Sequence, residues 1–220
     1  MRSHEIFDSK AKEYDGWYEK HPALYLSELH AVKSFECRNA VEIGVGTGRF
    51  TRDTGVTVGV DPSLEMLKLA PKSLNLVQGV GERLPLRSDG FDCSLLVVTL
   101  CFVEDPVKVL KEAARVSEKV IACIVPRDSP WGKHYSKLAE EGNPFYVQAR
   151  FYTVSEIIKM ASRMGLKPNK IMGVLKRGPG IEILEKPATL SADEAERYGF
   201  VCIELYRKKM GKAEQANSSR

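Results

Sequence analysis

Three glycines that follow a short apolar run constrain this chain more than any other feature of its sequence. The run from Ala40 to Ile43 has the length and apolar character of a buried strand, and Gly44, Gly46 and Gly48 follow it at alternate positions. Glycine has no Cβ, so a loop of this kind lets the backbone lie against a ligand. The pattern therefore predicts a strand that leads into a binding loop.

A second apolar run, Val56 to Val60, follows this loop and ends in the acid Asp61. A helix between the two runs can only be short, because Gly55 closes it. A strand, a glycine loop, a helix, a second strand and an acid form the plan of a nucleotide-ribose site in an open α/β sheet. The first part of the chain is thus expected to bind a nucleotide or a related ligand.

The rest of the chain alternates between strands and helices. Helices are expected over residues of about 4–20 (as one helix or two), from Pro22, from Pro62 to Pro71, from Asp105, from Ser129 to about Glu141, and after the capping boxes Thr153–Glu156 and Ser191–Glu194. Further strands are expected at Leu74–Val77, Phe91–Leu100, Val120–Val125, Lys170–Leu175 and, as an edge strand, Phe200–Tyr206. The repeated strand–helix order implies a parallel, doubly wound sheet with right-handed crossovers.

Length and composition favour one soluble domain. The chain has 220 residues, of which 43% are hydrophobic and 28% charged, as is ordinary for a globular protein. No apolar stretch approaches the ~18 residues of a membrane-spanning helix, and we expect no signal peptide, because the first residues lack an apolar segment. The net charge of +4 is scattered, so nucleic-acid binding is neither required nor excluded.

The cysteines show no metal-binding or redox pattern. No Cys-x-x-Cys pair occurs, and several cysteines lie in apolar runs, which is typical of buried reduced thiols in a cytoplasmic protein. We therefore expect a cytoplasmic location, no metal site and no disulfides. The five residues concerned are Cys37, Cys93, Cys101, Cys123 and Cys202.

Two common nucleotide motifs are absent from the glycine loop. A dinucleotide loop would have its third glycine at the position of Arg49, whereas this chain has it one place earlier, at Gly48. A P-loop would continue with Gly-Lys-Ser or Gly-Lys-Thr, which does not follow here. The acid Glu42, two residues before the first glycine, points to a different ligand.

Four motifs together resemble those of the class I S-adenosylmethionine-dependent methyltransferases, in the small-molecule branch called methyltransferase type 11, which includes quinone-biosynthesis enzymes. They lie between residues of about 40 and 125 in the family's order and spacing. The motifs are Glu42-x-Gly44-x-Gly46-x-Gly48, Gly59-Val60-Asp61-Pro62-Ser63-x-x-Met66-Leu67, Gly81-Glu82-x-Leu84-Pro85-Leu86 and Phe91-Asp92. The resemblance implies a Rossmann-like, mostly parallel seven-stranded sheet with an antiparallel last strand. It also implies an enzyme that uses S-adenosyl-L-methionine and releases S-adenosyl-L-homocysteine.

The resemblance further implies a role for each motif. The glycine loop would lie against the methionine part of the cofactor, Glu42 would accept a hydrogen bond from its ammonium group, and Asp61 would accept both ribose hydroxyls. Family members usually have an acid at the position of Val80, so here either Glu82 or the backbone alone would hold the adenine. The full set of predicted cofactor residues is Tyr14, Tyr18, Glu42, Gly44, Gly46, Gly48, Asp61, Pro62, Met66, Gly81, Glu82, Arg83, Thr99, Leu100 and Phe102.

Aromatic residues on either side of these motifs are candidates for the acceptor pocket, because ligands of this fold class bind outside the carboxyl ends of the strands. His134 is the candidate general base, although a structural histidine is the more common role for such a residue. Cys101 is expected to be a buried thiol, because its neighbours lack the Pro-Cys context of nucleophilic RNA methylases. The candidates are Tyr14, Trp17, Tyr18 and His21 as a lid, and Trp131, His134, Tyr135, Arg150 and Phe151 on the acceptor side.

We expect a single methyltransferase domain at residues 1–207, with an N-terminal helical lid at about 1–36 and an insert at about 127–152. A disordered tail is expected at 208–220. The expected reaction is an in-line displacement that moves a methyl group to a small-molecule acceptor.

Two alternatives remain open. The first is an RNA or protein methyltransferase of the same fold, which a basic groove at Arg127, Lys133, Lys137 and Arg150 would favour. Nucleic acid is not favoured, because the stretch 98–101 does not have the Asn-Pro-Pro-Tyr type motif of amino-group methylases. The second is a cofactor-binding partner protein that has lost catalysis. The sequence leaves the oligomeric state open.

Overall fold

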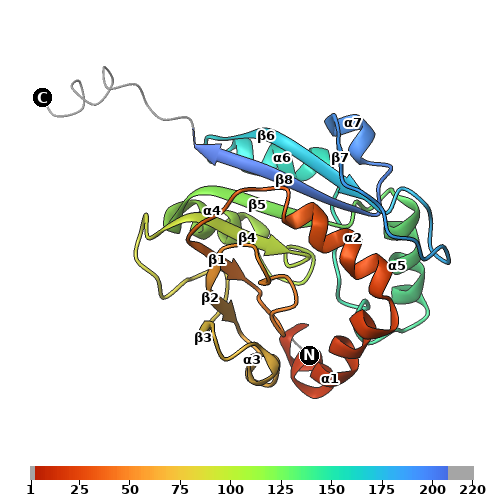
Figure 1. The fold of residues 1–220 in the computed structure, drawn as a ribbon, viewed down its shortest axis with the longest axis horizontal. Helices are drawn as coiled ribbons and strands as arrows, with labels where there is room; N and C mark the ends of the chain where they lie inside the picture. Colours follow the sequence, from red (N-terminus) through yellow and green to blue (C-terminus); the bar gives the residue numbers. More distant parts are fainter. Residues whose placement is uncertain (1–2, 208–220) are drawn as a thin grey trace, which may run out of the picture.

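A single mixed sheet with helices on both faces accounts for residues 3–207, the part of the chain that the computed structural model describes (Figure 1). The helices are α1 (Ser3–Lys20), α2 (Pro22–Val32), α3 (Leu64–Leu69), α4 (Pro106–Val116), α5 (Pro130–Glu140), α6 (Val154–Ser162) and α7 (Ala192–Ala195). The strands are β1 (Ala40–Ile43), β2 (Val56–Asp61), β3 (Asn75–Gln78), β4 (Phe91–Val97), β5 (Ser117–Ile124), β6 (Leu166–Val174), β7 (Ala188–Thr189) and β8 (Phe200–Arg207). The predicted tail at 208–220 lies outside the described residues.

The strands follow the order β3-β2-β1-β4-β5-β8-β6-β7. The first five are parallel, and β8 is antiparallel to both of its neighbours, β5 and β6. This confirms the predicted doubly wound α/β fold with an antiparallel last strand. The described sheet has eight strands instead of the predicted seven, because the two-residue β7 also pairs with β6.

The prediction of β8 as an edge strand is wrong. All residues of β8 from Phe200 to Leu205 are buried, and the strand lies between β5 and β6. The charged Glu204 would favour an edge strand if it faced water, but its carboxylate is paired inside the sheet. Lys119 Nζ lies 3.4 Å from Glu204 Oε1, and Asn169 donates a hydrogen bond to Glu204 Oε2 at 2.5 Å. A buried polar group that finds partners is compatible with a central strand.

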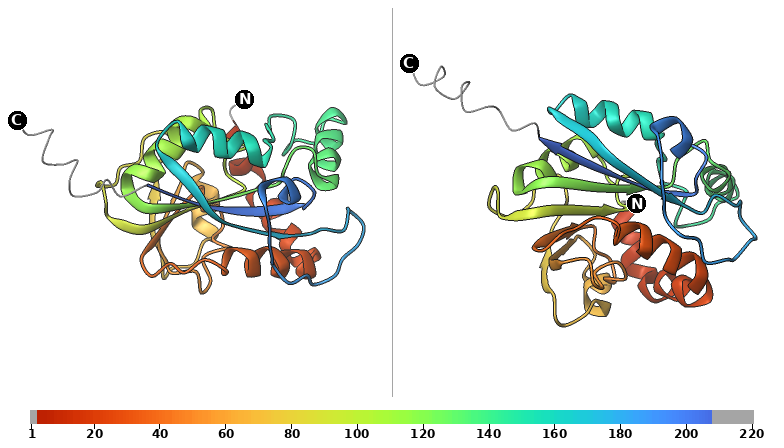
Figure 2. Two further views of the ribbon diagram at one scale, coloured as in Figure 1. Left: turned by 90° about the horizontal axis from the view of Figure 1, so that it is seen from above. Right: turned by 45° about the horizontal axis from the view of Figure 1, so that its top comes forward.

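Helices cover the two faces of the sheet, with α4 and α6 on one face and α2 on the other, whereas α1 packs against α2 and α3 (Figure 2). Two apolar cores follow from this arrangement. One joins α4 and α6 to the sheet through residues such as Leu110 and Ile157, and the other joins α2 to the opposite face through residues such as Leu29 and Phe35. Among residues 3–207, no helix is both long and apolar enough to cross a membrane.

Capping residues fix the helix starts that the sequence predicts. Asp105 caps α4 by accepting a hydrogen bond from the amide of Lys108 at 3.0 Å. The reciprocal bonds of the capping boxes at Thr153 and Ser191 are both present. The prediction of a short helix between the glycine loop and Gly55 is wrong, since residues 47–54 contain turns and no helix.

The expectation of reduced thiols is also wrong for four of the five cysteines. Cys37 is bonded to Cys93, and Cys123 is bonded to Cys202, whereas Cys101 is a buried free thiol. The pairing of β5 with β8 places Cys123 directly opposite Cys202. Sequence separations of 56 and 79 residues concealed both pairs, because neither is visible without the strand order.

These disulfides can be counted by chemical labelling. Alkylation of the unfolded protein without reductant is expected to modify one thiol, Cys101, whereas five are modified after reduction. Reduction should lower the free energy of unfolding by about 2–5 kcal/mol for each disulfide lost. The variant Cys101→Ser serves as a control and should label at no position before reduction. Five labelled thiols in unreduced wild type would show that the bonds do not form.

Candidate functional site

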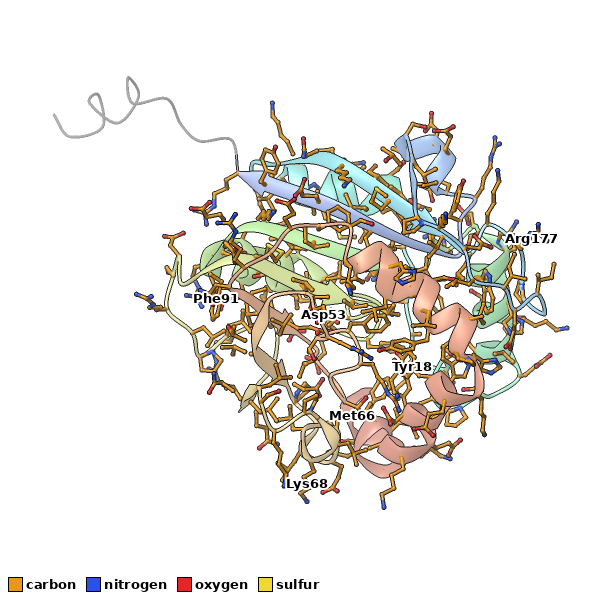
Figure 3. The ribbon with its side chains drawn as sticks, in the orientation of Figure 1. Tyr18, Asp53, Met66, Lys68, Phe91 and Arg177 are labelled. Atoms are coloured by element: carbon orange, nitrogen blue, oxygen red, sulfur yellow. A yellow bond between two sulfur atoms is a disulfide. The ribbon has the colours of Figure 1, made fainter. Side chains whose placement is uncertain are left out.

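The carboxyl ends of β1, β2 and β4 surround a cavity of about 390 Å³, here called the first cavity. Crevices of this kind form where the strand order of an open sheet reverses, which in this sheet is between β1 and β4. Ten predicted cofactor residues line it: Tyr14, Gly44, Gly46, Asp61, Pro62, Met66, Gly81, Glu82, Thr99 and Phe102. Figure 3 labels Met66 on α3, which lines this cavity, and Tyr18 on α1.

Two glycines shape the loop above β1. Gly44 has a φ of +75°, and a Cβ added there would lie 2.5 Å from Thr99 Cγ2, so only glycine fits. Gly46 has a φ of +52°, but a Cβ there would come no closer than 3.9 Å to another atom, Met66 Cε. The empty space at Gly46 belongs to the first cavity. This loop can therefore admit a ligand that lies directly against the backbone.

Asp61 is the last residue of β2 and lines the first cavity, and only 8% of its surface is exposed. Its Oδ2 accepts a hydrogen bond from the amide of Gly46, and its Oδ1 accepts one from the amide of Ser63, each at 2.8 Å. Each carboxylate oxygen has lone pairs for a further donor. Asp61 thus fixes the glycine loop from a position in the wall of the first cavity.

Glu42 lies beneath the loop and does not line the first cavity, since it is only 2% exposed. Its Oε2 is buried and has no hydrogen-bond partner within residues 3–207. Burial, reinforced by the charge of Asp61, raises the pKa of Glu42 well above its usual value. A buried acceptor without a donor beside a glycine loop fits a ligand that brings a positively charged group. The residues present therefore suit the ammonium and ribose groups of S-adenosylmethionine.

The far end of the first cavity contains the residues expected near adenine. Val80 and Glu82 both line it, and Oε1 of Glu82 accepts hydrogen bonds from the amides of Glu104 at 3.1 Å and Asp105 at 3.3 Å. Glu82 is thereby held at the position where it could replace the missing acid. The sequence analysis missed Phe7, Ile43, Val97, Val98, Val103, Glu104, Asp105 and Lys108, which also line this cavity.

Some predicted cofactor residues lie outside the first cavity. Tyr18 lines a second cavity, Arg83 lines neither cavity, and Leu100 is buried completely in the core. Gly48 packs against the end of α3, where a Cβ would lie 2.6 Å from Pro71 Cδ. These positions suggest packing roles for Gly48 and Leu100.

The second cavity has a volume of about 490 Å³ and lies beside the first. Its walls come mainly from α1, α2, α5 and the segment 143–151. The predicted acceptor residues Tyr14, Trp17, Tyr18, His21, Trp131, His134, Tyr135 and Phe151 all line it. Arg150 does not; its guanidinium carbon lies 5.5 Å from the ring centre of Tyr152. Tyr14, Val98 and Phe102 line both cavities, so the two are neighbours separated by few side chains.

The backbone at Val98 turns the chain away from the sheet at the boundary between the two cavities. Its φ of +53° is rarely adopted by a β-branched residue and marks local strain. Its amide donates a hydrogen bond to the carbonyl of Cys123 at 2.9 Å, which holds the strained residue against β5. The strand predicted to reach Leu100 therefore ends at Val97. The chain that follows it places Thr99 and Phe102 in the wall of the first cavity.

Polar contacts fasten α1 over both cavities. Asp15 Oδ1 accepts hydrogen bonds from Thr47 Oγ1 at 2.6 Å and Arg49 Nε at 2.7 Å, and Asp15 Oδ2 accepts from Arg49 Nη2 at 2.5 Å. Burial raises the pKa of Asp15, but the bonds from Arg49 and Thr47 outweigh burial and hold it below its usual value. Asp8 accepts a bond from Ser63 Oγ at 2.6 Å. Arg49, which departs from the dinucleotide pattern, thus connects the glycine loop to α1.

The hydroxyl and thiol groups near the boundary are protonated at neutral pH. Burial raises the pKa of Tyr14 to about 12, and its hydroxyl lies 3.1 Å from that of Tyr18. Burial also raises the pKa of the Cys101 thiol to about 12, and this thiol donates to the Val98 carbonyl at 3.3 Å. A thiol with a raised pKa is a poor nucleophile, which agrees with the prediction that Cys101 is a buried thiol.

Glu28 is a buried acid that the sequence analysis missed. It lies on α2, is 7% exposed and lines the second cavity. Within residues 3–207, no group donates a hydrogen bond to its carboxyl group or forms an ion pair with it. Burial raises the pKa of Glu28 to about 8. The only signal in the sequence is its position, one residue before the buried Leu29 on a helix with an apolar side.

Comparison with known proteins identifies relatives of the whole chain. Residues 41–120 match the family model described as a methyltransferase domain. An uncharacterized protein of Methanocaldococcus jannaschii is 38% identical over 167 residues, which are 74% of this chain and 81% of the relative. A crystal structure from Thermotoga maritima, with 36% identity and a TM-score of 0.86, covers 94% of this chain and 100% of the other. That protein is described as an S-adenosylmethionine-dependent methyltransferase, possible histamine N-methyltransferase.

A more distant structure shares the fold alone. Magnesium protoporphyrin IX methyltransferase of Synechocystis, crystallised with bound S-adenosylhomocysteine, is 14% identical with a TM-score of 0.65. The match covers 93% of this chain and 98% of that protein. The fold is therefore shared with a protein of much lower sequence identity.

The space at Gly46 gives a first test of the site. Gly46→Ala should weaken binding of S-adenosylmethionine at least tenfold, because the added methyl group enters the first cavity. Gly165→Ala is the matched control: Gly165 also has a positive φ, +74°, with open space around it, but lies outside both cavities. Both variants should lose about 1 kcal/mol of stability. Calorimetric titration measures binding, and equal affinities of the two variants would contradict this placement of the ligand.

The raised pKa of Glu28 predicts a pH-dependent cost of folding. The folded protein binds a proton at Glu28 more tightly than the unfolded chain does, so this acid favours folding at low pH and its contribution is lost as pH rises from 4.5 to about 8. Glu28→Gln has no acid at this position and so does not lose stability in this way. The free energy of unfolding of the variant minus that of wild type should therefore rise by about 3 kcal/mol between pH 4.5 and pH 7. Denaturant unfolding at several pH values measures the difference. The exposed Glu118→Gln should follow wild type, and a pH-independent difference for Glu28→Gln would disprove the shift.

Proposed function

We propose that this protein transfers a methyl group to a small-molecule acceptor. The proposal proceeds from its family, because the chain belongs to the class I S-adenosylmethionine-dependent methyltransferases of type 11. The observation that carries the proposal is the second cavity, which adjoins the first through Tyr14, Val98 and Phe102. Its volume of about 490 Å³ is within the usual range for small-molecule sites. The relative from Thermotoga maritima, whose description names a small amine, supports the same class of acceptor.

The proposed roles follow from the residues in and beneath the first cavity. The glycine loop, with Glu42 buried beneath it, would hold the methionine part of the cofactor, Asp61 would hold the ribose, and the backbone at Gly81 together with Glu82 would hold the adenine. When bound, the cofactor supplies a methyl group attached to a positively charged sulfur, and the sulfur is a good leaving group. Phe102, which lines both cavities, would lie where donor and acceptor meet, with Thr99 on the cofactor side.

The chain's contribution to the reaction is chiefly positioning and exclusion of water. Aromatic rings from α1 and α5 cover the second cavity, and α1 is fastened to the glycine loop through Asp15 and Arg49. We infer that residues of about 1–36 act as a lid and that the insert at about 127–152 forms the acceptor wall. Such orientation of two reactants can supply roughly 7–11 kcal/mol of the barrier reduction.

A general base is needed only for an acceptor that must lose a proton. His134 lines the second cavity, with its ring centre 5.6 Å from that of Tyr135. We keep His134 as a proposed base for such an acceptor.

The two alternative functions receive less support. Of the four basic residues that could form a groove, Arg127 is paired with Glu156 at 3.0 Å and Lys137 with Glu141 at 3.7 Å. Paired charges favour a small acceptor over RNA. A cofactor-binding partner without catalysis would not need an aromatic cavity next to the cofactor.

We also propose a cytoplasmic location, where the cofactor is made. The two disulfides restrict this proposal to cells whose cytosol tolerates them, as in hyperthermophilic archaea and bacteria.

Cofactor binding and acceptor class can be tested in one series. Wild type should bind S-adenosylmethionine and S-adenosylhomocysteine in calorimetric titrations, and Asp61→Asn should weaken both about 10- to 100-fold, because hydrogen bonds to a charged group are lost. Asp53→Asn is the control, because Asp53 lies in the turn before β2, outside both cavities, with a side chain that is 67% exposed. No binding by wild type would reject the proposal.

Transfer of labelled methyl groups then separates the acceptor classes. Small amines, phenols and quinols should be methylated in preference to total RNA and to protein. Methylation of RNA or protein alone would favour the first alternative, and cofactor binding without any transfer would favour the second.

A further inference from the structure

The second cavity places one buried acid among aromatic rings. Glu28 on α2 interacts electrostatically with four tyrosines, of which Tyr14 and Tyr18 come from α1 and Tyr135 and Tyr146 from α5 and the segment after it. The hydroxyl groups of these tyrosines are occupied in pairs: Tyr14 with Tyr18 at 3.1 Å, and Tyr135 with Tyr146. Within residues 3–207, the Glu28 carboxyl group is left with no hydrogen bond.

We propose that Glu28 binds a basic nitrogen of the methyl acceptor, and that the acceptor is a small amine with an apolar body. The inference rests on the proposed function and specifies its substrate class. Glu28 is a recognition residue in this proposal, because it selects the acceptor through its nitrogen.

Charge and burial support an amine over other acceptors. A buried carboxyl group without a partner is costly, and a cation that enters the cavity relieves the cost by forming a charge-assisted bond. Burial raises the pKa of Glu28 to about 8, so at neutral pH the group exists in both protonation states. When the amine binds, one proton can move from a Glu28 oxygen to the nitrogen of a neutral amine, and no other covalent bond changes.

The aromatic walls favour the same ligand. Tyr135 and Tyr146 stack with ring centres 4.6 Å apart, and the rings of Trp17 and Trp131 also line the cavity. The faces of such rings attract cations and cover apolar groups. The other charged residues lining the cavity are Glu13, Glu182 and Lys20, so acids outnumber the single lysine. An anionic acceptor would meet repulsion here.

The position of Glu28 also suits an acceptor that must reach the cofactor. Glu28 and Val98 line the same cavity, and Val98 is one of the three residues shared with the first cavity. An acceptor held at Glu28 therefore extends towards the cofactor along the aromatic wall. The acids Asp61 and Glu42 belong to the cofactor side and do not line the second cavity.

Intrinsic fluorescence offers a direct measure of occupancy, because the chain has two tryptophans, Trp17 and Trp131, and both line the second cavity. Protein saturated with S-adenosylhomocysteine is titrated at pH 7.5 with 2-phenylethylamine, histamine and butylamine, and with the corresponding alcohols. Wild type is expected to bind at least one amine tenfold or more tightly than its alcohol. Glu28→Gln should abolish this preference, whereas Glu118→Gln, which changes an exposed acid outside both cavities, should retain it.

Two controls separate the possible failures. Thermal unfolding and calorimetric binding of S-adenosylhomocysteine show whether Glu28→Gln is folded with an intact first cavity. If wild type fails to bind S-adenosylhomocysteine, the proposed function itself fails. If it binds but prefers no amine to its alcohol, or if folded Glu28→Gln keeps the preference, the assignment of Glu28 is overturned while the methyltransferase function stands.

Discussion

The site depends on the close contact between the ends of β1 and β4, where the strand order of the sheet reverses. Thr99 Oγ1 donates a hydrogen bond to the carbonyl of Ile43 at 3.0 Å, and the missing Cβ of Gly44 leaves room for the Thr99 side chain. The loops that leave these two strands then diverge to opposite sides, as in other doubly wound sheets. The crevice that results is the first cavity, so its existence follows from the strand order and from one small residue.

Cofactor and acceptor spaces are coupled because the same loop serves both. The segment that contains Gly46 continues directly into Thr47 and Arg49, whose side chains hold Asp15 of α1. Helix α1 in turn supplies Tyr14 to both cavities and Trp17 and Tyr18 to the second. A ligand that orders the loop therefore also steadies the helix that covers the neighbouring cavity. This coupling is local and needs no long-range change of the sheet.

Short sequence patterns predicted the features of the fold that short-range interactions determine. The strand before the glycine loop, the N-cap Asp105 and the capping boxes were predictable, because each depends on a short stretch of sequence. The ten predicted residues that line the first cavity came instead from the resemblance of their motifs to the family. Features set by distant packing were not predictable. The disulfides and the interior position of β8 depend on strand order. On α2, Leu26 is 39% exposed and Glu28 is buried, which reverses the order that hydrophobicity alone suggests.

The interior position of β8 also has a consequence for how the chain is made. Because β8 lies between β5 and β6, the sheet remains divided until residues 200–207 leave the ribosome. Before then, β5 and β6 each expose an unpaired edge, and such edges can pair wrongly with other chains. Of the described strands, β8 is therefore synthesised last, and Cys123 can meet Cys202 only after that step. The order of translation thus delays the pairings that connect β5 to β6.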